Sequence, residues 1–228
     1  MQLKKNIDFS LLVIQCSFIN MKENRNYYRE FLKDYNKIRS ETPKDELPKL
    51  LLHICCGACS CFPLVFLTDL FDITVYYTNS NIYPESEFEK RFEALTKYVE
   101  FVEKVCKTRI KIIKDRYNHD EFICDLLPFK DEEEGGHRCK ICIEKRFKRT
   151  FDFASSQGFK YVTTVMSISR NKDVDYLNML GEELAKKYNN LTYVHADFKK
   201  NNGQDIGVDL SKKIGIYRQC FCGCEFSK

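Results

Sequence analysis

The sequence KLLLHICCGAC at residues 49–59 joins a short apolar run to the first of three cysteine groups. The run 49–54 has the length of a buried strand, and it leads into a cysteine-rich loop. Four more strand patterns alternate with helical patterns downstream: strands at 73–77, 109–114, 160–166 and 191–195, and helices at 62–70, 84–105, 139–156 and 173–188. This alternation predicts an α/β fold, with a parallel sheet covered by helices on both faces. The cysteines would then lie at the strand ends, where such sheets bind ligands.

The first 48 residues lie outside this alternation. Residues 22–40 repeat aromatic and leucine side chains at helical spacing, and prolines at 43 and 48 then break the chain. We therefore predict a mostly helical N-terminal extension, 1–48, packed against an α/β domain, 49–228. The segment after residue 195 shows no clear period, and we expect it to be irregular.

Composition indicates a reducing compartment. The apolar run 9–19 is too short to span a bilayer, and no signal-peptide cleavage site follows it. We therefore expect a cytoplasmic protein with no membrane partner. In that compartment, 12 cysteines among 228 residues indicate metal binding or catalysis rather than structural disulfides.

Charge gives a weaker signal. The net charge of +4 is below that expected of a dedicated nucleic-acid module. Residues 138–149 nevertheless carry six Lys or Arg against one Glu. Such a segment is either a solvated helix face or a surface for phosphates.

Nine cysteines fall into three groups: Cys55, Cys56, Cys59 and Cys61 in HICCGACSC, Cys139 and Cys142 in GGHRCKIC, and Cys220, Cys222 and Cys224 in YRQCFCGC. Cys139 and Cys142 are three residues apart at the start of a predicted helix. Both sulfurs can therefore face one metal, and the helix N-terminus favours thiolate. The vicinal pair Cys55-Cys56 is not a zinc knuckle, and the thiolates outnumber the four that tetrahedral zinc needs. The residues thus favour an iron–sulfur cluster over zinc.

The third group leaves two roles open. Gly223 gives the backbone freedom to point the sulfurs of Cys222 and Cys224 the same way. The pair either binds metal or closes an easily reduced disulfide. We leave the other cysteines outside the ligand set: Cys16, Cys61, Cys106, Cys124 and Cys220.

Three motifs, in this order, are similar to those of a known family. LLLHxCC with a third cysteine, GGxRCxxC and YRQxxCGCxFS resemble the QueH-type epoxyqueuosine reductases over about residues 49–227. The stretches 81–91, 158–169 and 197–203 support the resemblance. It implies a Rossmann-like domain with a 4Fe-4S cluster and an additional mononuclear iron. The implied partners are a tRNA carrying epoxyqueuosine at the wobble position and an external electron donor, without cobalamin.

Carried over by position, the resemblance assigns four ligands to the 4Fe-4S cluster: Cys55, Cys56, Cys139 and Cys142. It assigns three to the second iron: Cys59, Cys222 and Cys224. A redox-active Cys222–Cys224 disulfide is the alternative, and in either role this pair is catalytic. The chain departs from the family pattern at three places. Gly57-Ala58 replaces Ala-Pro, which predicts a more flexible first loop; Arg170-Asn171 replaces Pro-Tyr; and Phe221 replaces Tyr.

The implied reaction sets requirements for other residues. Reducing an epoxide to an alkene takes two electrons and two protons and releases water, so a redox centre is needed. For binding the RNA substrate we predict Arg146, Arg149 and Arg218. The candidate proton donors are His53, Asp197 and Tyr217.

Three other functions fit parts of the pattern. An ATP-dependent tRNA-modifying enzyme would need a Gly/Ser-rich phosphate loop after the first strand, where only Gly57 stands. A non-catalytic, zinc-bearing RNA-binding module would hold zinc without inorganic sulfide. A thiol–disulfide oxidoreductase would keep its activity without any metal.

Overall fold

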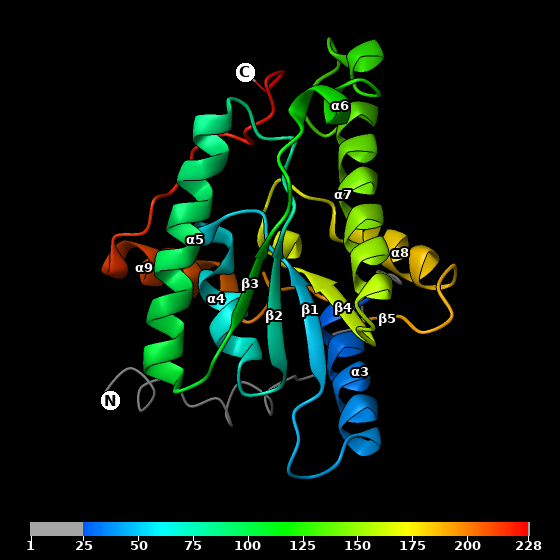
Figure 1. Cartoon of the computed structure of the whole chain (residues 1–228), viewed down its shortest axis with the longest axis vertical. Coiled ribbons are helices and arrows are strands. Elements are labelled where there is room, and N and C mark those ends of the chain that lie inside the picture. Colours follow the sequence, from blue (N-terminus) through cyan, green and yellow to red (C-terminus); the bar gives the residue numbers. More distant parts are fainter. Residues whose placement is uncertain (1–24, 228) are drawn as a thin grey trace.

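Five parallel strands form one sheet at the centre of the protein, in the order β3-β2-β1-β4-β5 (Figure 1). The computed structural model describes residues 25–227. The strands are β1 (Lys49–His53), β2 (Asp72–Tyr77), β3 (Lys111–Lys114), β4 (Tyr161–Thr164) and β5 (Thr192–Tyr193). All five predicted strands and the α/β fold are confirmed. This order places a crossover beside β1, the position at which open α/β sheets bind ligands.

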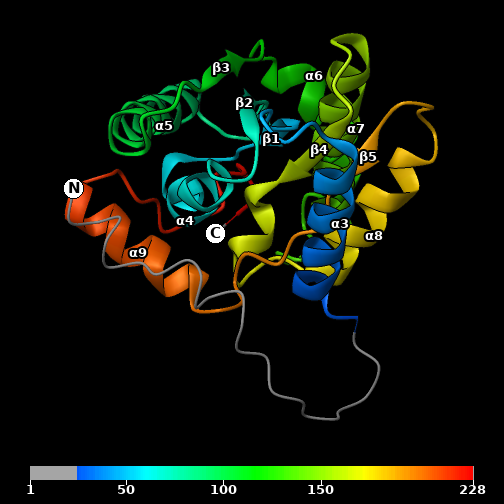
Figure 2. The same cartoon turned by 90° about the horizontal axis from the view of Figure 1, so that it is seen from below.

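Helices cover both faces of the sheet (Figure 2). On one face lie α4 (Gly57–Leu67), α5 (Glu85–Cys106) and α9 (Gly203–Ile214); on the other lie α7 (His137–Ser156) and α8 (Val174–Ala185). Successive residues of β1 divide between the two cores: Leu50 and Leu52 face the first, and Leu51 faces the second. Two shorter helices, α6 (His119–Ile123) and η1 (Leu127–Phe129), precede α7. No helix within residues 25–227 is long and apolar enough to cross a membrane.

The structure corrects the expected start of α4. We predicted a loop through the cysteines and a helix from residue 62, but α4 begins at Gly57, and Cys56 is its N-cap. The predicted loop is therefore the first turn of a helix, and its greater flexibility stays a prediction. An added Cβ at Gly57 would lie 2.8 Å from the backbone of Ala94 in α5, so the glycine lets the two helices touch.

The irregular C-terminal segment is also corrected, because it contains α9. Ile206, Leu210 and Ile214 recur at helical spacing and pack on the core. Gly203 and Gly207 interrupt this pattern in the sequence. In the fold Gly203 is needed, because a Cβ there would lie 2.6 Å from the Phe62 ring of α4, whereas a Cβ at Gly207 would come no nearer than 3.3 Å to Phe62. The strand predicted at 160–166 is also too long. It ends at Thr164 as β4, and the chain continues as the 3₁₀-helix η2 (Val165–Ile168).

The N-terminal helix α3 (Tyr27–Glu41) packs on the sheet domain rather than standing apart. It begins at Tyr27, later than the predicted residue 22. Phe31 is buried and contacts Phe66 and Phe198. Residues 9–19 and Cys16 lie outside the described residues, and a domain boundary at residue 48 stays a prediction.

A charged contact also ties α3 to the domain. His195, just after β5, has Nδ1 2.6 Å from Asp34 Oδ2 in α3 and Nε2 2.5 Å from Glu182 Oε1 in α8. Burial opposes protonation of this ring, but the hydrogen bonds to Asp34 and Glu182 outweigh it and raise the pKa of His195. Both ring nitrogens can donate only in the imidazolium form.

We expect the contribution of His195 to stability to depend on pH. Because its pKa is raised on folding, the contribution is full below the unfolded value of about 6.5 and is lost as pH rises through the folded value. His195→Gln should therefore cost about 1–3 kcal/mol at pH 6 and less at pH 9. Urea unfolding at both pH values measures this. An equal cost at both values would contradict a charged His195.

We also expect Gly57→Ala to destabilise the protein. The added methyl would push α4 away from α5, at a cost of about 1–3 kcal/mol that the better helix propensity of alanine offsets only in part. Gly207→Ala is the matched variant, because its Cβ would come no nearer than 3.3 Å to Phe62. It should cost less in the same urea titration. A Gly57→Ala protein as stable as the wild type would show that the helices can separate freely.

Candidate metal centre

Three thiols meet where β1 ends and α4 begins. The sulfurs of Cys55, Cys56 and Cys59 all lie within 4.8 Å of one another. As N-cap of α4, Cys56 accepts a hydrogen bond from the Cys59 backbone N–H at 3.3 Å. The Gln219 carboxamide, from the C-terminal segment, donates Nε2 to the same sulfur at 2.9 Å. The turn between β1 and α4 thus holds sulfur ligands where a phosphate loop would stand in an ATP-using enzyme.

These contacts favour a thiolate at Cys56. Hydrogen bonds from the Cys55 and Cys59 thiols, with a further one from Gln219, hold the pKa of Cys56 well below its ordinary value. Cys55 donates its thiol hydrogen to Cys56, and Cys59 donates to Cys55 and Cys56, so the pKa of each donor is raised. Of the three, Cys56 is therefore the sulfur that is favoured as thiolate. Thiolates are the ligands that soft metals and iron–sulfur clusters take, so this donor set fits such a group.

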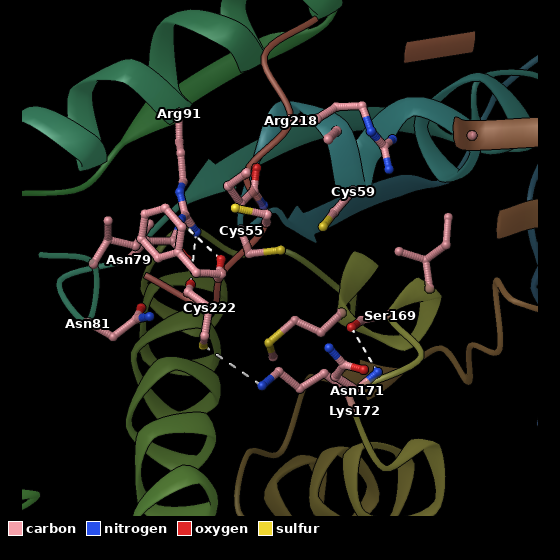
Figure 3. A pocket seen from close by; sticks show the side chains of 18 of the residues that line it. Cys55, Cys59, Asn79, Asn81, Arg91, Ser169, Asn171, Lys172, Arg218 and Cys222 are labelled. Carbon is pink, nitrogen blue, oxygen red and sulfur yellow. Dashed lines mark hydrogen bonds between the residues drawn. The ribbon is translucent and has the colours of Figure 1, made fainter. Parts of the chain in front are cut away.

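A cavity of about 270 Å³ opens beside the thiols (Figure 3). Its lining comes from distant parts of the chain: Cys55 and Cys59 at one end of the sheet, Arg91 of α5, Arg146 of α7, Lys172, and Cys222 of the C-terminal segment. Arg146 is buried, and its charge lies close to Cys142, Cys222 and Cys55. Lys172 Nζ is 4.0 Å from Cys222 Sγ. Positive charge therefore faces the sulfurs from two sides.

The other predicted ligands stand outside the three-thiol group. Cys142 is buried in α7, which raises its pKa, and Cys139 accepts the Gly135 backbone N–H at 3.2 Å. Burial also raises the pKa of Cys224 to about 11. The assignment of Cys55, Cys56, Cys139 and Cys142 to one cluster stays a prediction, because the structure gathers Cys59 with the first two instead.

The predicted Cys222–Cys224 disulfide is not supported. All eleven cysteines within residues 25–227 are free thiols. Gly223 stands between the pair with φ of 96°, and the sulfur of Cys222 faces Lys172. The chain thus turns between the two residues without joining them.

A buried ion pair, missed in the sequence, holds the C-terminal segment over the cavity. Arg91 Nε donates to Glu87 Oε1 at 2.7 Å, one helical turn away in α5. Its Nη1 donates to the Cys222 carbonyl at 2.9 Å and its Nη2 to the Phe221 carbonyl at 3.3 Å. Tyr217 donates its hydroxyl to Glu87 at 3.0 Å. The stretch 81–91, which contains Arg91, was part of the family resemblance. Nothing in the sequence indicated, however, that Arg91 contacts Cys222, 131 residues further along the chain.

Comparison with known proteins identifies the family. A family profile described as epoxyqueuosine reductase QueH matches residues 50–228. The chain belongs to the QueH family. It is 36% identical over 181 residues to the "Epoxyqueuosine reductase QueH" of Streptococcus pyogenes, covering 79% of this chain and 70% of that protein. It is 33% identical over 210 residues to that of Staphylococcus aureus, covering 91% and 86%.

A solved structure has a similar fold. The U34-tRNA thiolase NcsA of Methanococcus maripaludis, with its [4Fe-4S] cluster, matches with a TM-score of 0.50. The match covers 92% of this chain and 78% of the thiolase at 14% identity. The likeness shows that the fold of this QueH-family chain occurs elsewhere.

The three predicted arginines lie in different surroundings in this QueH-family chain. Arg146 is buried among the thiols, away from the surface where RNA phosphates would lie. Arg149 is exposed and pairs with Asp115 through Nε and, at 2.9 Å, through Nη2. Arg218 lines the cavity and donates to Ser211 Oγ at 2.6 Å. Of the three, Arg146 and Arg218 reach the cavity and Arg149 does not.

None of the three candidate proton donors lines the cavity. Burial lowers the pKa of His53 to about 3, so its ring is neutral at neutral pH and has no imidazolium proton to give. The Tyr217 hydroxyl is taken by Glu87, and Asp197 lies beside Phe62 and Phe198 instead. Lys172 is the ammonium group that the structure does bring to the cavity.

We expect Gln219 to strengthen metal binding. Gln219→Leu keeps the size of the side chain but removes the N–H donor to Cys56, and losing such a partner typically lowers metal affinity about 10- to 100-fold. Competition with a chelator measures this as metal retained per chain. Gln204→Leu is the control, because Gln204 lines the same cavity but pairs with Arg170. Equal retention in both variants would leave Gln219 without this role.

Proposed function

We propose that this chain reduces epoxyqueuosine to queuosine at the wobble position of tRNA. The observation that carries the proposal is the group of three cysteine sulfurs within 4.8 Å of one another, beside a cavity, in a chain of the QueH family. The similar proteins of this family are named epoxyqueuosine reductases, after this reaction. The donor set supplies the kind of site that such a reduction needs.

The chemistry requires electrons that side chains do not provide in a catalytic cycle. We propose a 4Fe-4S cluster and an additional iron, which would deliver single electrons from an external donor to the epoxide carbons and polarise the epoxide oxygen. The proposed ligands are Cys55, Cys56, Cys139 and Cys142 for the cluster, and Cys59, Cys222 and Cys224 for the iron. The chain's part is to place positive charge near these sulfurs. Arg146 lies close to Cys55, Cys142 and Cys222, and Lys172 faces Cys222. Such charges favour the thiolate form that binds metal.

The cavity suits one base taken out of an RNA loop. Enzymes that act on a base in RNA need it exposed in a pocket, and bases are most easily splayed out in loops. Phe221, at the cavity, is 44% exposed, and the Arg91 guanidinium lies 5.1 Å from its ring centre. Arg218 adds a positive charge to the lining. We propose that Arg149 and Arg218 contact RNA phosphates, and that Arg146 acts on the buried sulfurs.

The test combines metal analysis with turnover. Protein purified without oxygen should hold about four irons and four acid-labile sulfides per chain, or about five irons with the second site filled. Epoxyqueuosine-bearing tRNA should then be converted to queuosine-bearing tRNA, as measured by nucleoside mass spectrometry. Cys222→Ser should lower turnover at least about 10-fold, because it removes a sulfur that faces the cavity. Cys124→Ser, an exposed cysteine in no group, should not.

Two outcomes would overturn the proposal. Zinc without sulfide would remove the electron source and favour a binding module. Full turnover after removal of all metal would assign the reaction to thiols alone.

A further inference from the structure

Three carboxamides line the cavity and have unused acceptors. The Oδ1 atoms of Asn79 and Asn81 and the Oε1 atom of Gln219 are buried and have no hydrogen-bond partner among residues 25–227. Asn79 and Asn81 are only 1% and 3% exposed. A buried polar oxygen without a partner loses its bonds to water and gains none in return, and three around one cavity are unusual in a folded protein.

The other ends of two of these side chains are fixed. Asn79 donates its Nδ2 to the Ile54 carbonyl at 2.8 Å, in the turn that follows β1. Gln219 donates its Nε2 to Cys56 Sγ. Their oxygens are therefore the atoms left for a ligand. Asn79 and Asn81 stand on the cavity wall that also carries Arg91 and Cys222 (Figure 3).

A carboxamide oxygen only accepts hydrogen bonds, so its ligand must donate. We propose that Asn79, Asn81 and Gln219 form a subsite for the N–H and O–H groups of the substituent that modification adds to the base, and so select modified over unmodified tRNA. This inference rests on the proposed function, since it takes the reductase substrate as its ligand. A guanine without that substituent would leave the oxygens unpaired, and sites built to hydrogen-bond a ligand reject analogues that lack the donor groups.

The experiment compares two RNAs on the metal-loaded protein. The dissociation constant is measured for an anticodon stem–loop bearing queuosine and for the same stem–loop with unmodified guanine. Wild type should prefer the queuosine RNA by at least about 10-fold, equivalent to about 1.4 kcal/mol. Asn81→Ala should lose most of this preference while binding the unmodified RNA within about twofold of wild type. Asn81→Asp, which keeps acceptor oxygens, should retain part of the preference.

Asn171→Ala is the matched control, because Asn171 lines the same cavity but is exposed. It should keep the full preference, and all variants should carry the wild-type amount of iron. No preference in the wild type, or an unchanged preference in Asn81→Ala, would overturn the subsite. If wild type still reduces epoxyqueuosine in that case, only the subsite fails. If it neither binds the stem–loops nor turns over, the reductase proposal fails with it.

Discussion

The contact between Gly57 and the backbone of α5 sets the position of the cysteine motif. Because Gly57 has no side chain, α4 can begin at this residue in direct contact with Ala94 of α5. The helix therefore starts only two residues after Cys55. That start makes Cys56 the N-cap, so its sulfur meets the free N–H of Cys59 and the positive end of the helix. The neighbouring cysteines Cys55 and Cys56, whose spacing does not suit a zinc knuckle, thus both lie in the tight turn from β1 into α4.

A second constraint brings the end of the chain to that turn. The buried charge of Arg91 would be costly alone, but Glu87 balances it, and two backbone carbonyls accept hydrogen bonds from Nη1 and Nη2. Both carbonyls belong to the segment that carries Cys222 and, through Gln219, reaches Cys56. The candidate metal centre therefore depends on two contacts: the turn after β1, which is local in sequence, and a long-range contact from the Arg91–Glu87 pair to the C-terminal segment.

The sequence was enough to predict what depends on local pattern. Strand and helix periods gave the sheet and most helices, and the cysteine groups pointed to the carboxyl end of β1. The helix α9 was missed because glycines such as Gly203 and Gly207 usually interrupt helices. Only the fold shows that both lie against Phe62 of α4, where a glycine allows close packing. The surroundings of Arg146 were missed for a different reason. Its basic neighbours suggested a surface, whereas the helix face on which it lies decides that it is buried among sulfurs. Partners such as Arg91 and Cys222 cannot be read from spacing, because only the folded chain brings them together.

At the three places where this chain departs from the expected family pattern, the structure shows what the residues present do. Arg170 replaces a proline, and its side chain pairs with Gln204 and Asp205 of α9, linking the segment after η2 to that helix. Phe221 lacks a hydroxyl, but it contacts Arg91 through its ring and its carbonyl, neither of which needs one. At 57 and 58 the pair Gly-Ala begins α4 and leaves room for α5. At all three places the residues of this chain join helices or border the cavity, and none of them supplies a sulfur.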